Sequence, residues 1–188
     1  VIALGSVTND FGIPGVSEHA LGMKSVTEAL QIRSTLLRHF EDLCRVENSG
    51  EMVVNIVGGG PTGVEMAGAI AELRKGPLTL DFAPAANRIK INIIEAGPRV
   101  LPMFTARLSE KTEQSLNKLG VSVCSNKVVK EIKARSIVFK SGETFPSDLT
   151  IWTAGVMGEP TSAKLKLPFE RGRIITEPTL QVTNYPYI

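Results

Sequence analysis

This sequence has few cysteines and almost equal numbers of basic and acidic residues. Its two cysteines, Cys44 and Cys124, cannot build a disulfide framework and lack metal-ligand spacing, so we interpret them as small core residues and expect no metal site. The 21 basic and 19 acidic residues leave a net charge of +2, which is too small to indicate a nucleic-acid partner. No apolar run approaches the roughly 18 residues that a membrane-spanning helix needs.

A leader segment and polar ends are missing as well. The chain begins with the apolar run Val1–Leu4, which predicts a buried strand leading to Gly5, and it ends on Tyr187 and Ile188. It has no initiator Met and no basic region followed by a cleavage site, as a signal peptide would have. We therefore expect this chain to be a segment of a longer protein.

The spacing of apolar residues predicts an α/β fold. After a Ser25-Val-Thr-Glu28 capping box, apolar residues recur every three or four positions up to Leu43, which predicts a helix. Further strands are expected at 52–57, 89–94, 121–124 and 149–153, and helices at 61–75 and 106–119. Residues 128–145 alternate apolar and polar side chains, so we expect a Rossmann-like parallel sheet with helices on both faces plus an antiparallel β-meander.

A glycine cluster lies where the first of these parallel strands meets the next helix. The pattern G-x-G-x-x-G is fitted by Gly58, Gly59, Gly60, Pro61, Thr62 and Gly63. At this glycine content the pattern alone has a chance match of roughly one in eight, and its position between a strand and a helix makes it specific. Gly58 is expected to allow the tight turn, Gly60 to admit a pyrophosphate, and Gly63 to let the helix lie close to the strand. We therefore predict a dinucleotide site in preference to a purely structural turn.

The acidic residue that binds the adenosine ribose is expected about 20 residues after the fingerprint, at the end of the next strand. Asp81 lies 18 residues past Gly63, but no strand is predicted before it. Glu95 lies 32 residues past Gly63 and ends the run 90–94, so we choose Glu95 as the acceptor for the ribose hydroxyls. A carboxylate there repels a 2′-phosphate and favours NADH over NADPH, although the nearby Arg99 could soften that preference.

Several motifs in this order resemble one family of flavoproteins. They are Phe11-Gly-Ile-Pro-Gly-Val16, the segment from Ile56 through the glycine cluster to Gly68, Glu95-Ala-Gly-Pro-Arg-Val-Leu-Pro102, and Ile151-Trp-Thr-Ala-Gly155. Together they resemble type II NADH dehydrogenases, the single-subunit NADH:quinone oxidoreductases of the pyridine nucleotide-disulfide oxidoreductase superfamily. The resemblance implies that residues 1–48 are the tail of a split FAD-binding domain and a crossing helix. It implies that residues 49–155 form the NAD(H)-binding domain and that 156–188 return toward the FAD domain.

The resemblance also implies roles for individual residues. Glu65, two positions past the third glycine, is similar to the family carboxylate that orients the nicotinamide, and we expect it in the first turn of the helix. The alternative is an ordinary carboxylate favoured by the helix dipole. Ala154 and Gly155 resemble the loop beneath the nicotinamide ribose, Ala96 and Arg99 follow the ribose acceptor, and Leu4, Gly5 and Ser6 are expected beside FAD.

The expected function follows from this resemblance and has open alternatives. We expect an NADH-binding segment of an enzyme that passes a hydride from NADH to FAD and electrons on to a quinone, with most of the FAD site outside this chain. A sulfide:quinone oxidoreductase or another FAD-linked oxidoreductase, or a non-catalytic NAD(H)-sensing module, remains open. The full protein is expected in the cytoplasm or peripherally at the inner face of the cell membrane, with any membrane contact made by parts absent from this chain.

Overall fold

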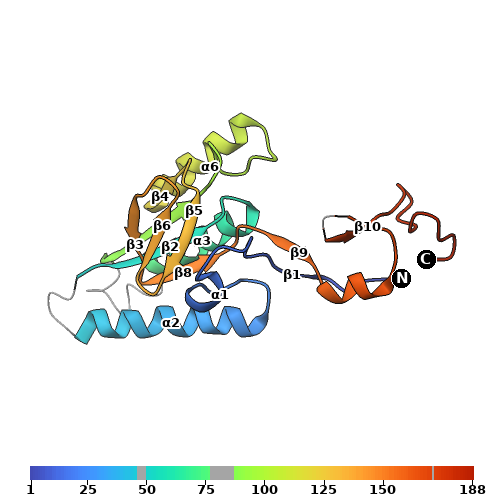
Figure 1. Cartoon of the computed structure of the whole chain (residues 1–188). Helices are drawn as coiled ribbons and strands as arrows, with labels where there is room; N and C mark the ends of the chain where they lie inside the picture. The colour runs from blue at the N-terminus through green and yellow to red at the C-terminus, as the bar shows by residue number, and fades with distance from the viewer. Residues whose placement is uncertain (46–49, 77–86, 171) are drawn as a thin grey trace. The chain divides into compact units, whose positions relative to one another are not determined.

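The computed structural model describes residues 1–45, 50–76, 87–170 and 172–188, which form two compact units (Figure 1). The larger unit is Asp10–Ala154, and the smaller unit combines Val1–Asn9 with Gly155–Ile188. The predicted acidic alternative Asp81 lies outside the described residues.

A four-stranded parallel sheet forms the centre of the larger unit. Its order is β4-β3-β2-β8, with β2 at Met52–Val57, β3 at Ile89–Ile94, β4 at Val121–Cys124 and β8 at Leu149–Trp152. All four predicted parallel strands are confirmed. In the register of the sheet, Val57 lies beside both Ile94 and Trp152. The carboxyl ends of β2, β3 and β8 therefore form one edge, and the loops that follow them share it.

The three long helices pack against one face of this sheet. They are α2 (Val26–Arg45), α3 (Pro61–Lys75) and α6 (Ala106–Leu119). One hydrophobic cluster joins their buried side chains to alternate strand residues such as Val54, Ile56 and Ile91. The α/β class and the parallel sheet are as predicted, and all three long helices lie on the same face.

The antiparallel meander covers the opposite face, which explains the absence of a long helix there within the described residues. It consists of β5 (Val129–Lys133), β6 (Ser136–Phe139) and β7 (Thr144–Pro146). A second hydrophobic cluster places Val57, Ile94 and Trp152 of the sheet against the meander. The short helix α1 (Val16–His19) contributes Val16 to the same cluster. The predicted meander is therefore confirmed.

The smaller unit contains two antiparallel strand pairs and a 3-10 helix. Strand β1 (Ser6–Thr8) pairs with β9 (Val156–Gly158), and β10 (Phe169–Glu170) pairs with β11 (Arg173–Ile174). The 3-10 helix η1 spans Pro160–Leu165. Residues Val1–Gly5 are exposed and irregular, so the buried strand predicted there is wrong. An apolar run becomes a buried strand only where other strands or helices cover it, and no described element covers this one.

Local signals at the helix ends have mixed outcomes. The capping box before α2 is confirmed, because the Ser25 N–H donates to Glu28 Oε2 over 2.7 Å and the Glu28 N–H donates to Ser25 Oγ over 3.2 Å.

The two cysteines differ in burial. Cys124 is half-buried, but Cys44 is exposed, which contradicts its predicted place in the core. The stripe of α2 buries Leu43, and the next residue along a helix points about 100° away.

The described residues contain neither a membrane-spanning helix nor a metal-binding cluster. No described helix has the length and apolar character to cross a membrane. Among the same residues, no group of three or more His, Cys, Asp or Glu side chains is arranged to hold a metal ion.

Candidate functional site: the glycine-rich edge of the sheet

The turn from β2 into α3 is built around Gly58. Its φ of +114° lies in the region that L side chains rarely adopt, and a Cβ there would lie 2.7 Å from Ala154 Cα. The Gly58 N–H donates to the carbonyl oxygen of Ile94 over 2.8 Å, which ties the turn to the end of β3. The predicted role of Gly58 in a tight turn is thus supported by both conformation and space.

Gly63 lets the first turn of α3 approach this loop closely. A Cβ on Gly63 would collide with the carbonyl oxygen of Gly58 and lie 2.8 Å from Thr153 Oγ1. The Thr153 hydroxyl donates to the carbonyl oxygens of Val57, over 2.9 Å, and Gly58, over 3.2 Å. Thr153 was not predicted as a site residue, and only its place directly after β8 could have indicated it.

Gly60 has a different environment from the other fingerprint glycines. It is the N-cap of α3 with an ordinary extended conformation, and a Cβ there would meet no atom within 4 Å. Pro61 follows at the first helical position, and no side chain caps the helix. The first N–H groups of a helix have no intrahelical acceptor and carry the positive end of its dipole. The open space beside Gly60 therefore adjoins a natural position for an anion.

Glu95 lies beside the glycine-rich loop and holds it from the end of β3. One carboxylate oxygen accepts the Gly59 N–H over 2.6 Å, and the other accepts the Gly97 N–H over 2.7 Å. A Cβ on Gly59 would lie only 2.8 Å from the same carboxylate, so a larger residue here would displace the Glu95 side chain. A carboxylate has about four lone-pair sites, so two remain for sugar hydroxyls.

The residues after Glu95 form a loop that is closed on itself. The Arg99 guanidinium donates to the carbonyl oxygens of Pro102, over 3.2 Å, and Phe104, over 3.1 Å. These bonds hold the guanidinium on its own loop, and it forms no ion pair with Glu95 among the described groups. Ala96 is exposed at the start of this loop.

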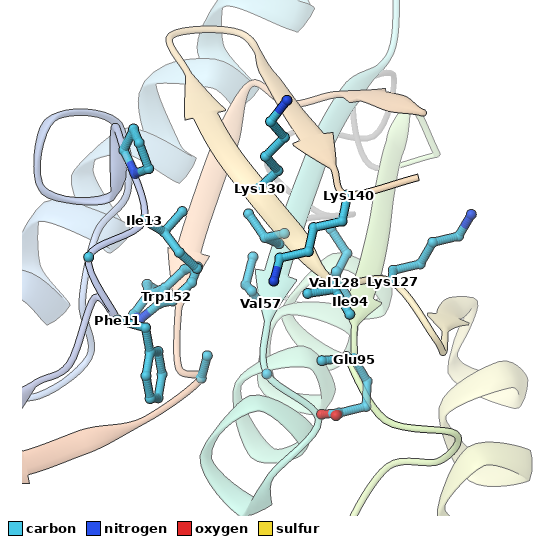
Figure 2. A pocket seen from close by; sticks show the side chains of 16 residues that line it. Phe11, Ile13, Val57, Ile94, Glu95, Lys127, Val128, Lys130, Lys140 and Trp152 are labelled. Carbon is cyan, nitrogen blue, oxygen red and sulfur yellow. The ribbon is translucent and has the colours of Figure 1, made fainter. Parts of the chain in front are cut away.

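A pocket of about 480 Å³ opens along the same edge of the sheet (Figure 2). One wall is the loop 11–14, the floor is formed by the ends of β2, β3 and β8, and the other wall is the meander. Its lining includes Gly58, Glu95, Ala96 and Ala154, so the pocket adjoins the predicted cofactor residues. Its apolar floor is made by Val57, Ile94 and Trp152. This volume is within the range of sites for small ligands and parts of cofactors.

Glu65 is exposed on α3 and does not line this pocket. It is the fifth residue of α3, and the first turn of the helix holds no acidic residue, so its predicted place in the first turn is wrong. The discrepancy arises because the helix begins at Pro61, which moves Glu65 into the second turn. A dipole interaction, which fades beyond the first turn, is correspondingly a weaker explanation for this carboxylate.

Four predicted cofactor residues belong to the smaller unit. Leu4 and Gly5 are exposed, Ser6 begins β1, and Gly155 accepts a hydrogen bond from the Asn9 N–H over 3.1 Å. Gly5 has a φ of +78° with open space around its Cα, which fits a close approach by another molecule. The larger unit itself brings together Gly58, Gly59, Gly60, Pro61, Thr62, Gly63, Glu95, Ala96 and Ala154 at one edge of the sheet.

This geometry suits binding more than acid–base chemistry. The described edge offers backbone N–H groups at a helix start, a fixed carboxylate and an apolar pocket. These are the features that hold a diphosphate, a sugar diol and a flat ring, respectively.

Comparisons with known proteins agree with this arrangement. The family model described as pyridine nucleotide-disulphide oxidoreductase matches residues 1–188. A type II NADH:quinone oxidoreductase of Mycobacterium tuberculosis is 31% identical over 202 residues, which covers 100% of this chain and 44% of that protein. An external alternative NAD(P)H-ubiquinone oxidoreductase from Arabidopsis thaliana mitochondria is 34% identical over 172 residues, covering 85% of this chain and 29% of that protein.

A solved structure is similar as well. The NDH2 protein of Plasmodium falciparum, solved in complex with NADH, superposes with a TM-score of 0.76 and 30% sequence identity. The match covers 83% of this chain and 34% of that chain. The present chain thus spans less than half the length of each of these relatives.

Proposed function

The chain belongs to the pyridine nucleotide-disulphide oxidoreductase family, and from this premise we propose that it is the NADH-binding segment of a flavoprotein NADH:quinone oxidoreductase. NADH, when bound, supplies a hydride to FAD, and the electrons then pass to a quinone. The relatives named above are NADH:quinone or NAD(P)H-ubiquinone oxidoreductases, which supports this substrate pair. The redox chemistry belongs to the cofactors, and the protein contributes binding, orientation and exclusion of water.

The observation that carries the proposal is the contact between Glu95 and the glycine-rich loop. The carboxylate reaches Gly59 N–H across the gap between the ends of β2 and β3, so the sugar-binding and phosphate-binding parts are adjacent. Gly60 leaves open space at the start of α3, where a Cβ would otherwise stand. The pyrophosphate is assigned to the N–H groups of this helix start and the adenosine ribose to Glu95. A fixed negative charge beside the 2′ position disfavours a 2′-phosphate, which makes NADH the preferred nucleotide.

The remaining assignments concern the nicotinamide and the flavin. Glu65, on the exposed side of α3, would hold the carboxamide and orient the nicotinamide, while Ala154 and Gly155 would leave room for its ribose. Leu4, Gly5 and Ser6 would lie beside FAD, most of whose site belongs to parts of the protein outside this chain. We accordingly assign residues 49–155 to the NAD(H)-binding domain and residues 1–48 and 156–188 to parts adjoining the FAD domain.

Two alternatives remain for the full protein. A sulfide:quinone oxidoreductase has less support, because such enzymes do not usually keep an intact NAD fingerprint and this chain does. A non-catalytic NAD(H)-sensing module is separated from an enzyme by the flavin itself. In the full-length protein, NADH should bleach the yellow colour of the bound FAD. A flavin that stays oxidised in excess NADH would leave the sensing module as the better description.

Any attachment to the inner face of the cell membrane is assigned to segments beyond this chain.

Calorimetry of the 188-residue chain with NADH, NADPH and FAD tests the binding proposal directly. We expect NADH to bind more tightly than NADPH and FAD to bind very weakly, since few flavin-contacting residues are present. FAD affinity comparable to that for NADH would overturn the domain assignment. A chain that is folded by circular dichroism yet binds no NADH would overturn the function.

The substitution Glu95→Ser tests the selection of the sugar. Without the carboxylate, NADH should bind about tenfold more weakly, and the gap between NADH and NADPH should narrow. Because Glu95 also accepts the Gly59 and Gly97 N–H groups, thermal unfolding of the variant must be measured alongside binding. An unchanged preference for NADH in a folded variant would move the role of ribose acceptor to Asp81 or another residue.

A further inference from the structure

Three lysines line the pocket from the side of the meander: Lys127, Lys130 and Lys140. Glu95 is the only acidic residue among the described residues that line it, and both of its oxygens accept backbone N–H groups. The lining is therefore electropositive, although the pocket floor is apolar. Such a pocket favours a ligand that combines a flat apolar part with phosphate groups.

The three lysines differ in what they contact. Lys127 pairs with Glu143 and lies over the rings of Phe139 and Phe145, at 5.7 and 5.4 Å from their centroids. Lys130 and Lys140 have no anionic partner among the described residues. In Figure 2 the Lys130 side chain extends away from the pocket, whereas the Lys140 side chain extends into it, over Val57. Among the described lining residues, Lys140 alone thus presents to the pocket an ammonium group with no ion-pair partner.

The backbone at Lys140 is fixed, so this ammonium group starts from a defined point. The Lys140 N–H donates to the carbonyl oxygen of Val128 over 2.9 Å. On its N-terminal side, Phe139 is 1% exposed in the core beneath the meander, and its N–H donates to the carbonyl oxygen of Glu143 over 2.9 Å. A lysine stem of four methylene groups anchored here can pack along apolar side chains and carry its charge into the pocket.

We propose that Lys140 is a further specificity-determining residue of this site, which binds a phosphate group of the dinucleotide from the wall opposite the glycine-rich loop. The inference rests on the proposed function, because it takes NAD(H) or NADP(H) as the ligand of the pocket. The phosphate is either part of the diphosphate, which both nucleotides carry, or the 2′-phosphate, which only NADPH carries. In the second case Lys140 offsets the repulsion that Glu95 exerts on NADPH.

The test compares Lys140→Gln with wild type by calorimetry of NADH and NADPH binding to the 188-residue chain. Because the Lys140 side chain is exposed, the variant should fold as wild type does, which thermal unfolding verifies. We expect binding to weaken about fivefold, as for an exposed charge–phosphate contact, and Lys140→Arg to restore most of it. A loss shared by NADH and NADPH assigns the contact to the diphosphate, and a loss confined to NADPH assigns it to the 2′-phosphate.

Lys130→Gln is the matched control, since it removes the same charge from the same meander where the side chain points away. It should change either affinity less than twofold, and added salt should reduce wild-type binding more than binding to Lys140→Gln. Equal losses of nucleotide affinity in both variants would overturn the proposal, because they would indicate a general electrostatic attraction and not a specific contact. Unchanged binding in Lys140→Gln would overturn it while leaving the proposed function intact. If the folded wild type bound neither nucleotide, both the proposal for Lys140 and the proposed function would be wrong.

Discussion

Gly60 and Gly63 show how one residue type serves two purposes within a single turn of helix. The Gly63 Cα is crowded by the Gly58 carbonyl oxygen, so this glycine is needed for the fold itself. The Gly60 Cα faces open space in an ordinary backbone conformation, so nothing in the described chain requires a glycine there. A ligand that approaches the backbone closely would require it.

Alanine substitutions at these glycines should therefore separate stability from binding. Gly63→Ala should lower the free energy of unfolding by about 3 kcal/mol, because the added methyl group overlaps backbone atoms. Gly60→Ala should leave stability nearly unchanged but weaken NADH at least about tenfold, as its methyl group enters the phosphate position. Chemical denaturation and calorimetry measure the two effects.

Gly68 provides the control on the same helix. A Cβ at Gly68 meets no atom within 4 Å, so Gly68→Ala should raise the free energy of unfolding by about 0.5–1 kcal/mol through helix propensity alone. If Gly60→Ala bound NADH as tightly as wild type, the pyrophosphate could not lie at this helix start.

Site residues were predictable from sequence where their position along a strand decided their role. The strand end before Glu95 favours it over Asp81, and the structure places its carboxylate beside the glycine-rich loop, while its role as ribose acceptor stays a prediction. Lys140 and Thr153 were missed because their side chains reach the site across the fold, from the meander and from the end of β8. No spacing between Lys140 and the fingerprint encodes that approach, since it depends on how the meander lies over the sheet.

At the scale of elements, helix α2 offers a local test of stability. Its start is held by the capping box, in which Glu28 accepts hydrogen bonds from the N–H groups of Lys24 and Ser25 and from the Ser25 hydroxyl. Partial burial raises the pKa of Glu28, but these three hydrogen bonds outweigh it and lower the pKa below its usual 4.5. The charged form is thus favoured in the folded state.

The capping contribution should consequently depend on pH. Ser25→Ala should lower the free energy of unfolding by about 1 kcal/mol at neutral pH. The stabilisation that Glu28 provides is complete above pH 4.5 and is lost as the pH falls through the lower folded-state pKa. Urea denaturation of wild type and Glu28→Gln across pH 3 to 7 should show a stability difference that shrinks toward the acid end. A difference independent of pH would contradict the role of the charged carboxylate.

Elements were predicted well where the sequence pattern and the surrounding structure agree. The parallel strands were found from compact apolar runs, and the meander from alternation, because these patterns reflect which faces are buried. The segment Val1–Gly5 has the same apolar character but lies exposed, because burial depends on partners elsewhere in the chain. The sequence does not indicate which face of the sheet each helix covers, since the apolar face of a helix fits either side.

At the scale of the whole molecule, the two units differ in how much core they possess. Both hydrophobic clusters consist entirely of residues from Asp10–Ala154. In the smaller unit Val182 is the only hydrophobic residue classed as buried among those described, while Leu4, Leu165, Phe169 and Leu180 are exposed. Small segments with so little burial cannot offset the entropy of folding.

A fragment limited to residues 10–154 should therefore fold on its own. It should unfold in one cooperative transition and bind NADH within about twofold of the 188-residue chain, because the proposed contacts with the diphosphate and the adenosine ribose all lie within it. Circular dichroism on heating and calorimetry check the two expectations. A fragment that is unfolded at room temperature would show that residues 1–9 and 155–188 contribute to the core after all.

The double attachment of Glu95 constrains how nucleotide preference can change over evolution. The same two oxygens that we assign to sugar selection also clasp neighbouring backbone amides on both sides. Replacing Glu95 to admit NADPH would also remove the hydrogen bonds that hold the glycine-rich loop. The replacement should therefore weaken the binding of both NADH and NADPH. Relatives that evolve a preference for NADPH are then expected to change surrounding residues first and to keep the glutamate with its two backbone hydrogen bonds.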